Sequence, residues 1–188
     1  MDYNAMKDLL EFYIDDVIDT PIAVTLFNEG KNKMANVVNA NFPDLPEAPV
    51  EGDQFVFDAK YHNAPVLYAA AMYKGYDSSI GEKQSYMADF QEALRDFQND
   101  YIVPLVYRND SLIYKYTVTE TTGIDTITVT DESFNRYGNL SVYVNNLPAS
   151  YSRYGNVFTF ATTIPLGSTV IVAWEPNQYY VEPWNRMW

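Results

Sequence analysis

The sequence predicts an α+β fold, with a helical bundle over residues 1–107 followed by a small antiparallel β-sandwich or barrel over residues 108–176. A change of period supports this division. Apolar residues recur every three or four positions in the first part, as on one face of a helix. In the second part they recur at every second position, as on one face of a strand. Residues 177–188 show neither period, and we expect an extended tail there.

The centre of the predicted bundle is a helical hairpin within residues 64–101. Its first helix, residues 64–73, is apolar almost all round and rich in alanine, which lets a neighbouring helix approach its backbone closely. Pro65 suits the start of this helix, because proline is tolerated in a first turn. The second helix is amphipathic. Its apolar stripe supplies the expected bundle core: Tyr86, Phe90, Leu94 and Phe97.

Two more helices are expected before the hairpin. The first spans residues 5–19, and its apolar side holds Met6, Leu9, Leu10, Tyr13 and Val17. Thr20 is expected to cap the second helix, which Pro21 opens. That helix lies between residues 22 and 40 and is expected to break or bend near Gly30.

The stretch between these helices and the hairpin contains few helix-forming signals. Three prolines within residues 41–49 predict an extended loop. Residues 54–57 form either a short strand or the lead-in to the hairpin.

Five short runs of β-branched and aromatic residues predict the strands of the second part. They are residues 112–119, 124–130, 140–144, 156–160 and 169–174. Turn-forming pairs and triplets rich in glycine, asparagine and proline separate them. This regular spacing is typical of a small antiparallel sandwich or barrel.

Charge and aromatic content limit the possible functions. The net charge is −13 and tyrosine occurs 17 times. Residues 1–107 carry 18 acidic and 7 basic residues, whereas residues 108–188 carry 7 and 5, so the acidity belongs to the helical part. Because phosphate contacts require lysine and arginine, this balance argues against sequence-independent nucleic-acid binding. Tyrosine-rich surfaces suit half-buried sheets and protein interfaces.

Few residues are suited to catalysis or metal binding. Cysteine is absent, and His62 is the only histidine and most simply a polar residue at a helix start. The acidic pairs Asp15–Asp16 and Asp131–Glu132 lack the spacing of a calcium-binding loop. The first is interpreted as a solvated helix face and the second as a turn. No phosphate-binding glycine motif occurs. We expect no enzyme activity, no cofactor, no metal and no catalytic residue.

No signal peptide or membrane-spanning stretch is apparent, which predicts a soluble protein without a membrane partner. The strongest candidate for an interaction site is the tail. Its four large aromatic residues each bury about 150 to 250 Å² when they dock. They are Tyr179, Tyr180, Trp184 and Trp188. They pack either on the chain's own sandwich or, as anchors, on a neighbouring subunit or partner.

The combination of both parts resembles the head-to-tail connector proteins, or adaptors, of tailed bacteriophages. An acidic first helix, a long insert, an alanine-rich helix at 64–73 and an amphipathic helix carry the first half of the resemblance. The second half is the run Leu-Ser-Val-Tyr-Val-Asn-Asn at 140–146, followed by the strands at 157–160 and 167–172. It is similar to a β module of phage tail fibres and other virion proteins. Asn146 stands where that module usually has glycine and tolerates the same left-handed turn.

The resemblance implies a structural virion protein of the neck, made in the host cytoplasm. Subunits would form a homo-oligomeric ring of about twelve copies. The ring would sit between the portal protein and a downstream tail or nozzle protein, and the genome would pass through it without specific binding during ejection. An acidic wall suits such a passage, because it repels DNA phosphates.

Two alternatives remain open at this stage. One is a tail-fibre attachment or baseplate structural protein, if the β module is the true relative. The other is a carbohydrate-binding module, which would present a planar exposed row of aromatic side chains on the sandwich. A hydrolase would require a cleft with a perturbed pair of carboxylates.

Overall fold

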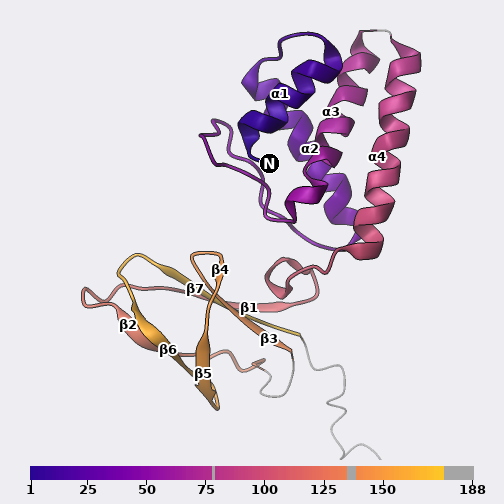
Figure 1. Cartoon of the computed structure of the whole chain (residues 1–188). Coiled ribbons are helices and arrows are strands. Elements are labelled where there is room, and N and C mark those ends of the chain that lie inside the picture. The colour runs from indigo at the N-terminus through magenta and orange to yellow at the C-terminus, as the bar shows by residue number, and fades with distance from the viewer. Residues whose placement is uncertain (78, 135–138, 176–188) are drawn as a thin grey trace, which may run out of the picture. The chain divides into compact units, whose positions relative to one another are not determined.

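A computed structural model describes residues 1–77, 79–134 and 139–175. The chain divides into two compact units, of which the first spans Met1–Val103 and the second begins at Pro104. The first contains four α-helices and the second contains antiparallel sheets, which confirms the predicted α+β fold (Figure 1). The sequence places the boundary after residue 107, whereas the second unit begins at Pro104. The difference is the short 3₁₀ helix η2, Leu105–Tyr107, which contacts strands of the second unit and therefore belongs to it.

The first unit is a bundle of α1 (Tyr3–Ile14), α2 (Thr20–Val37), α3 (Asn63–Tyr76) and α4 (Ile80–Asp100), with the 3₁₀ helix η1 (Ala59–Tyr61) before α3. Helix α3 contacts each of the other three. Every residue from 64 to 71 is buried. The alanine-rich helix is therefore the centre of the bundle, as its composition predicts.

The prediction for the end of the first helix is wrong. Helix α1 stops at Ile14, because Asp15 adopts a left-handed conformation with φ of 54°. Val17 lies beyond this break, so it leaves the helical phase and is 79% exposed instead of packed. Thr20 is the first residue of α2, and the cap position belongs to Asp19.

Gly30 does not break or bend α2 into two helices. The helix runs from Thr20 to Val37. A Cβ atom at Gly30 would lie 2.9 Å from the Cα of Pro65 and 3.1 Å from the Cβ of Tyr68. The glycine thus serves a close approach of α2 and α3, and its missing side chain is a packing feature.

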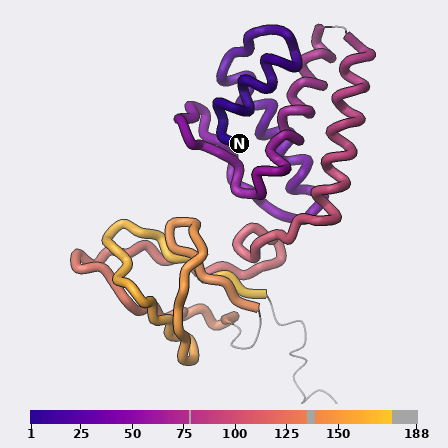
Figure 2. Tube along the Cα trace, in the orientation of Figure 1, coloured from indigo at the N-terminus to yellow at the C-terminus, as the bar shows by residue number. Residues whose placement is uncertain are grey.

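The proline-rich segment after α2 is an irregular loop, as predicted, and its trace can be followed to the start of α3 in Figure 2. Residues 54–57 form no strand, so the alternative, a lead-in to the hairpin, is correct. Two of its side chains, Phe55 and Phe57, are buried. The ring of Phe57 lies 5.5 Å from those of Phe42 and Phe97, which ties the loop to α4.

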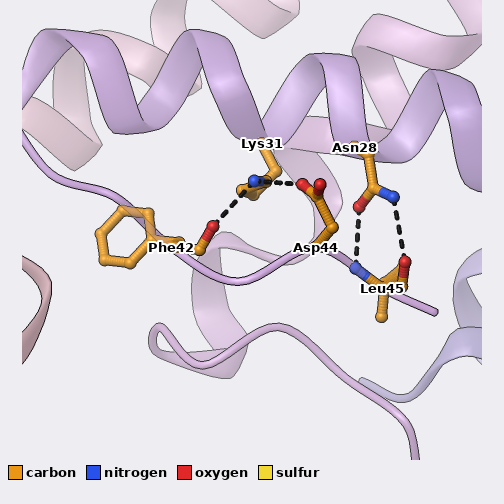
Figure 3. Close-up of polar contacts among 5 residues, drawn as sticks. All are labelled: Asn28, Lys31, Phe42, Asp44 and Leu45. Atoms are coloured by element: carbon orange, nitrogen blue, oxygen red, sulfur yellow. Dashed lines mark hydrogen bonds and ion pairs between the residues drawn. The ribbon is translucent and has the colours of Figure 1, made fainter.

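Two polar side chains of α2 hold this loop (Figure 3). Lys31, only 2% exposed, donates hydrogen bonds to the carbonyl oxygen of Phe42 at 2.8 Å and to Asp44 Oδ1 at 2.5 Å. Asn28 pairs with both backbone groups of Leu45, accepting from its N–H at 2.9 Å and donating to its oxygen at 3.1 Å. The loop is therefore fixed by hydrogen bonds from one helix.

The second unit is a sandwich of two antiparallel sheets. Its strands are β1 (Leu112–Thr117), β2 (Ile124–Thr128), β3 (Leu140–Val144), β4 (Leu147–Pro148), β5 (Tyr151–Tyr154), β6 (Val157–Ile164) and β7 (Thr169–Trp174). One sheet has the order β1-β7-β3-β4 and the other β2-β6-β5. All five predicted strands are present, and β4 and β5 are additional. The choice left open between sandwich and barrel is thereby settled.

Inward-facing residues of both sheets share one core. Phe158 of β6 and Val172 and Trp174 of β7 are fully buried in it. The indole N–H of Trp174 donates to the carbonyl oxygen of Ser133 at 3.1 Å, which satisfies its polar atom. The turn between β3 and β4 is left-handed at Asn145 and Asn146, with φ of 50° and 65°. Asn146 thus adopts the left-handed conformation that is expected of it.

Candidate contact surface of the bundle

The predicted core residues of α4 occupy different depths. Phe90 and Phe97 are buried, whereas Tyr86 and Leu94 are half-buried. The ring of Phe90 lies 5.3 Å from that of Tyr68 on α3. The hydroxyl of Tyr86 donates to the carbonyl oxygen of Tyr13 at 2.9 Å, so it links α4 to α1. The predicted tail residues, Tyr179, Tyr180, Trp184 and Trp188, lie outside the described residues.

A groove of about 770 Å³ opens where α1 ends, α2 begins and α3 ends. We call it the end groove. Its apolar lining is formed by Ile14, Pro21, Ile22, Leu26, Tyr73 and Tyr76. Ile22 is 50% exposed and Tyr76 is 80% exposed. Large apolar side chains thus line the groove and remain open to solvent.

Four carboxylates also line the end groove: Asp15, Asp16, Glu29 and Asp77. Basic side chains are absent from its lining among the described residues. Within the same part of the chain, none of the four carboxylates forms a salt bridge. The groove therefore combines an apolar surface with unneutralised negative charge.

Hydrogen bonds hold one of these acids in its ionised form. The hydroxyl of Tyr73 donates to Asp16 Oδ2 at 2.6 Å, and the N–H of Val17 donates to Asp16 Oδ1 at 2.8 Å. These bonds, that of Tyr73 first, lower the pKa of Asp16 below its ordinary value and raise the pKa of Tyr73. Asp16 is thus fixed as an anion at the groove.

The α1–α2 connection, the end of α3 and the start of α4 lie at one end of the bundle (Figure 1), and further exposed apolar residues belong to these segments or to the last turn of α1. Phe12 and Val17 are both 79% exposed, and Ile80 is 68% exposed. Contiguous exposed apolar surface with a polar rim is typical of protein interaction sites. This end is the best candidate for a functional surface in the described bundle.

His62 has a structural role. It is buried, with its Nδ1 2.6 Å from the carbonyl oxygen of Met1 and its Nε2 2.8 Å from that of Phe57. Within the described ranges, no group of three or more histidine, aspartate or glutamate side chains is placed to hold a metal ion. The described helices include none that is long and apolar enough to cross a membrane.

Sequence reasoning treats Asp15 and Asp16 as a solvated helix face and does not identify the end groove. Two signals point to it in retrospect. Ile22 stands in the first turn of α2 and Tyr76 is the last residue of α3, and both are exposed where they line the groove. Both are large apolar side chains in positions where a monomer alone would favour polar ones.

The described sandwich gives less support for a binding surface. Of its aromatic residues, only Tyr154 is exposed among those that the structure describes. A single ring does not form the planar row that sugar stacking requires. The chain matches no protein family, no curated protein and no solved structure among those with which it was compared.

Proposed function

We propose that this protein is a structural component of a bacteriophage neck, where its copies form a ring between the portal protein and the tail. The observation that carries the proposal is the end groove, with its exposed apolar side chains and acidic lining. A surface of this kind serves contact with another protein. The organisation of an acidic bundle followed by a β module, which resembles the adaptors, supplies the place in the virion.

The charge distribution supports the same role. Residues 1–107 have a net charge of −11, and residues 108–188 have −2. A ring lined by acidic bundles repels the phosphates of passing DNA, so the duplex slides without binding. The proposal therefore requires weak affinity for DNA at moderate salt as well as contact with protein.

Mixing the full chain with its cognate portal protein tests this role. Electron microscopy should show an added ring on one face of the portal, and the chain should show no stable DNA complex in an electrophoretic mobility assay. A portal that stays bare, or tight binding of DNA at moderate salt, would contradict the proposal.

A further inference from the structure

We propose that the end groove receives the segment at residues 184–188 of a second copy of this chain, so that neighbouring subunits are linked head to tail. This inference rests on the proposed ring and names the partner of the groove. The segment reads Trp-Asn-Arg-Met-Trp and lies outside the described residues. Its chemistry, its tether and its place in the chain each support the pairing.

The chemistry of the segment complements that of the groove. Trp184, Met187 and Trp188 provide apolar surface, and Arg186 is the only basic residue among residues 176–188. The groove offers exposed Ile22 and Tyr76 beside four carboxylates. Arginine forms paired hydrogen bonds with carboxylates and stacks on aromatic rings, so one side chain can use both kinds of lining.

The size of the groove suits a short segment with large side chains. Its volume of about 770 Å³ falls within the range of roughly 300–1,000 Å³ that is typical of sites enclosing a small ligand. Tryptophan and arginine are also the residue types that most often dominate binding energy at interfaces. The segment supplies both of these residue types, and the positive charge of Arg186 is opposite to that of the groove.

The tether allows the segment to leave its own subunit. Eight residues, 176–183, separate the last described residue, Glu175, from Trp184. Fully extended, eight residues span at most about 26–29 Å. This reach is comparable to the length of a helix of the bundle.

The two contact surfaces differ, which determines the kind of assembly. The groove belongs to the helical unit and the segment follows the β unit. An interface between two different surfaces is heterologous, and such interfaces generate rings when the rotation closes. The proposed contact therefore permits a ring, which forms if the rotation between neighbouring subunits closes.

Site-directed cross-linking of the full chain tests the contact directly. Because the chain contains no cysteine, introduced cysteines give unambiguous products. Thr25→Cys places a thiol in the groove and Asn185→Cys places one in the segment, and both changes retain the proposed anchors. A mixture of the two variants, oxidised and analysed by mass spectrometry, should contain a cross-linked pair of chains.

The matched control replaces the groove cysteine with Val50→Cys, an exposed site outside the groove lining. We expect about tenfold less of the cross-linked pair from this control. Equal yields would overturn the proposal. So would a Thr25→Cys, Asn185→Cys double variant that cross-links only within single chains at every concentration, because the segment would then occupy its own groove.

Charge reversal provides a second measurement on the same pair of cysteines. Asp77→Lys in the Thr25→Cys chain and Arg186→Glu in the Asn185→Cys chain should each lower the yield about tenfold when introduced alone. Asp77 follows the last residue of α3, where a lysine is favourable for the helix dipole, so the change should not unfold the bundle. Combining both reversals should restore the yield, and failure to restore it would refute the ionic part of the contact.

The outcomes separate this inference from the proposed function. The cross-linking assay contains no portal protein, and the portal assay does not depend on the cysteines. If a ring forms on the portal while the groove pair fails to cross-link, only the inference is wrong. If the pair cross-links but the portal stays bare, the contact between copies stands and the role in the neck falls.

Discussion

The two units of the chain differ in the net charge of their residues and in where their exposed apolar side chains lie. The bundle carries most of the negative charge and gathers exposed apolar side chains at one end, among them Phe12, Val17, Ile22, Tyr76 and Ile80. Residues 108–188 carry a net charge of only −2, and the exposed apolar residues of the described sandwich come from separate strands and turns. The comparison supports the proposal that the bundle, and not the sandwich, offers the contact surface.

Removing the centre of the sandwich core should have the largest effect and would test whether the two units are independent. Trp174→Ala deletes a fully buried ring, which should lower the free energy of unfolding of the sandwich by about 3–5 kcal/mol. In NMR spectra the strand resonances should collapse while the helix resonances persist. Tyr154→Ala, at a side chain 91% exposed, should change neither set. Simultaneous loss of both sets would show that the units unfold together.

Loss of the hydrogen bonds by which Lys31 holds the loop after α2 should have the next largest effect on stability. Lys31→Met removes the hydrogen bonds to Phe42 and Asp44, and hydrogen bonds that involve a charged group contribute roughly 1.5–3 kcal/mol. Hydrogen exchange at the Leu45 amide should accelerate as the loop loosens. The control, Lys33→Met, changes an exposed lysine of the same helix and should leave that exchange rate unchanged.

Replacing two glycines of the bundle by alanine separates the effect of packing on stability from that of helix propensity. Gly30→Ala introduces a Cβ only 2.9 Å from the Pro65 Cα, and such overpacking costs about 1–3 kcal/mol, partly offset by the better helix propensity of alanine. Chemical denaturation should show a net loss of stability. Gly81→Ala in α4 meets no atom within 4 Å and should be neutral or stabilising by up to about 1 kcal/mol. A stabilised Gly30→Ala variant would contradict the close approach of α2 and α3.

The smallest effect concerns the charge of the end groove. Tyr73→Phe removes the hydrogen bond that contributes most to the lowered pKa of Asp16, so that pKa should rise toward its ordinary value. Because the folded state favours ionised Asp16, its contribution to stability is present above the ordinary pKa and disappears as pH falls through the lowered value. Carbon-detected NMR titration of Asp16 measures the change. An unchanged pKa of Asp16 would show that the hydrogen bond from Tyr73 does not lower it.

Residue type and periodicity together predicted the fold: the 3.6-residue period of the helices and the two-residue period of the strands. Residue type alone predicts a helix for the alanine-rich stretch and strands for the five β-branched runs. Where prediction failed, tertiary packing decided the outcome. Gly30 reads as a helix breaker in isolation, yet α2 continues through it, and the missing side chain leaves room for Pro65 and Tyr68 of α3.

The end groove was beyond sequence reasoning for a related reason. It forms where three helix ends meet, and α1 ends at a left-handed Asp15 that no periodicity reveals. Once the helix stops there, Val17 turns outward and Asp16 comes within reach of Tyr73. A one-turn error in a helix boundary was enough to misplace these side chains.

Strand β7 lies between β1 and β3, with Leu112 and Leu140 both paired to Trp174. Tension applied to the chain beyond Glu175 would therefore load two hydrogen-bonded ladders at once, and in shear, because the bonds of antiparallel strands run across the strand axis. A pulling force on that end would therefore act on a central strand of the sheet and not on an edge strand. A force on this end is therefore shared between two strand pairs.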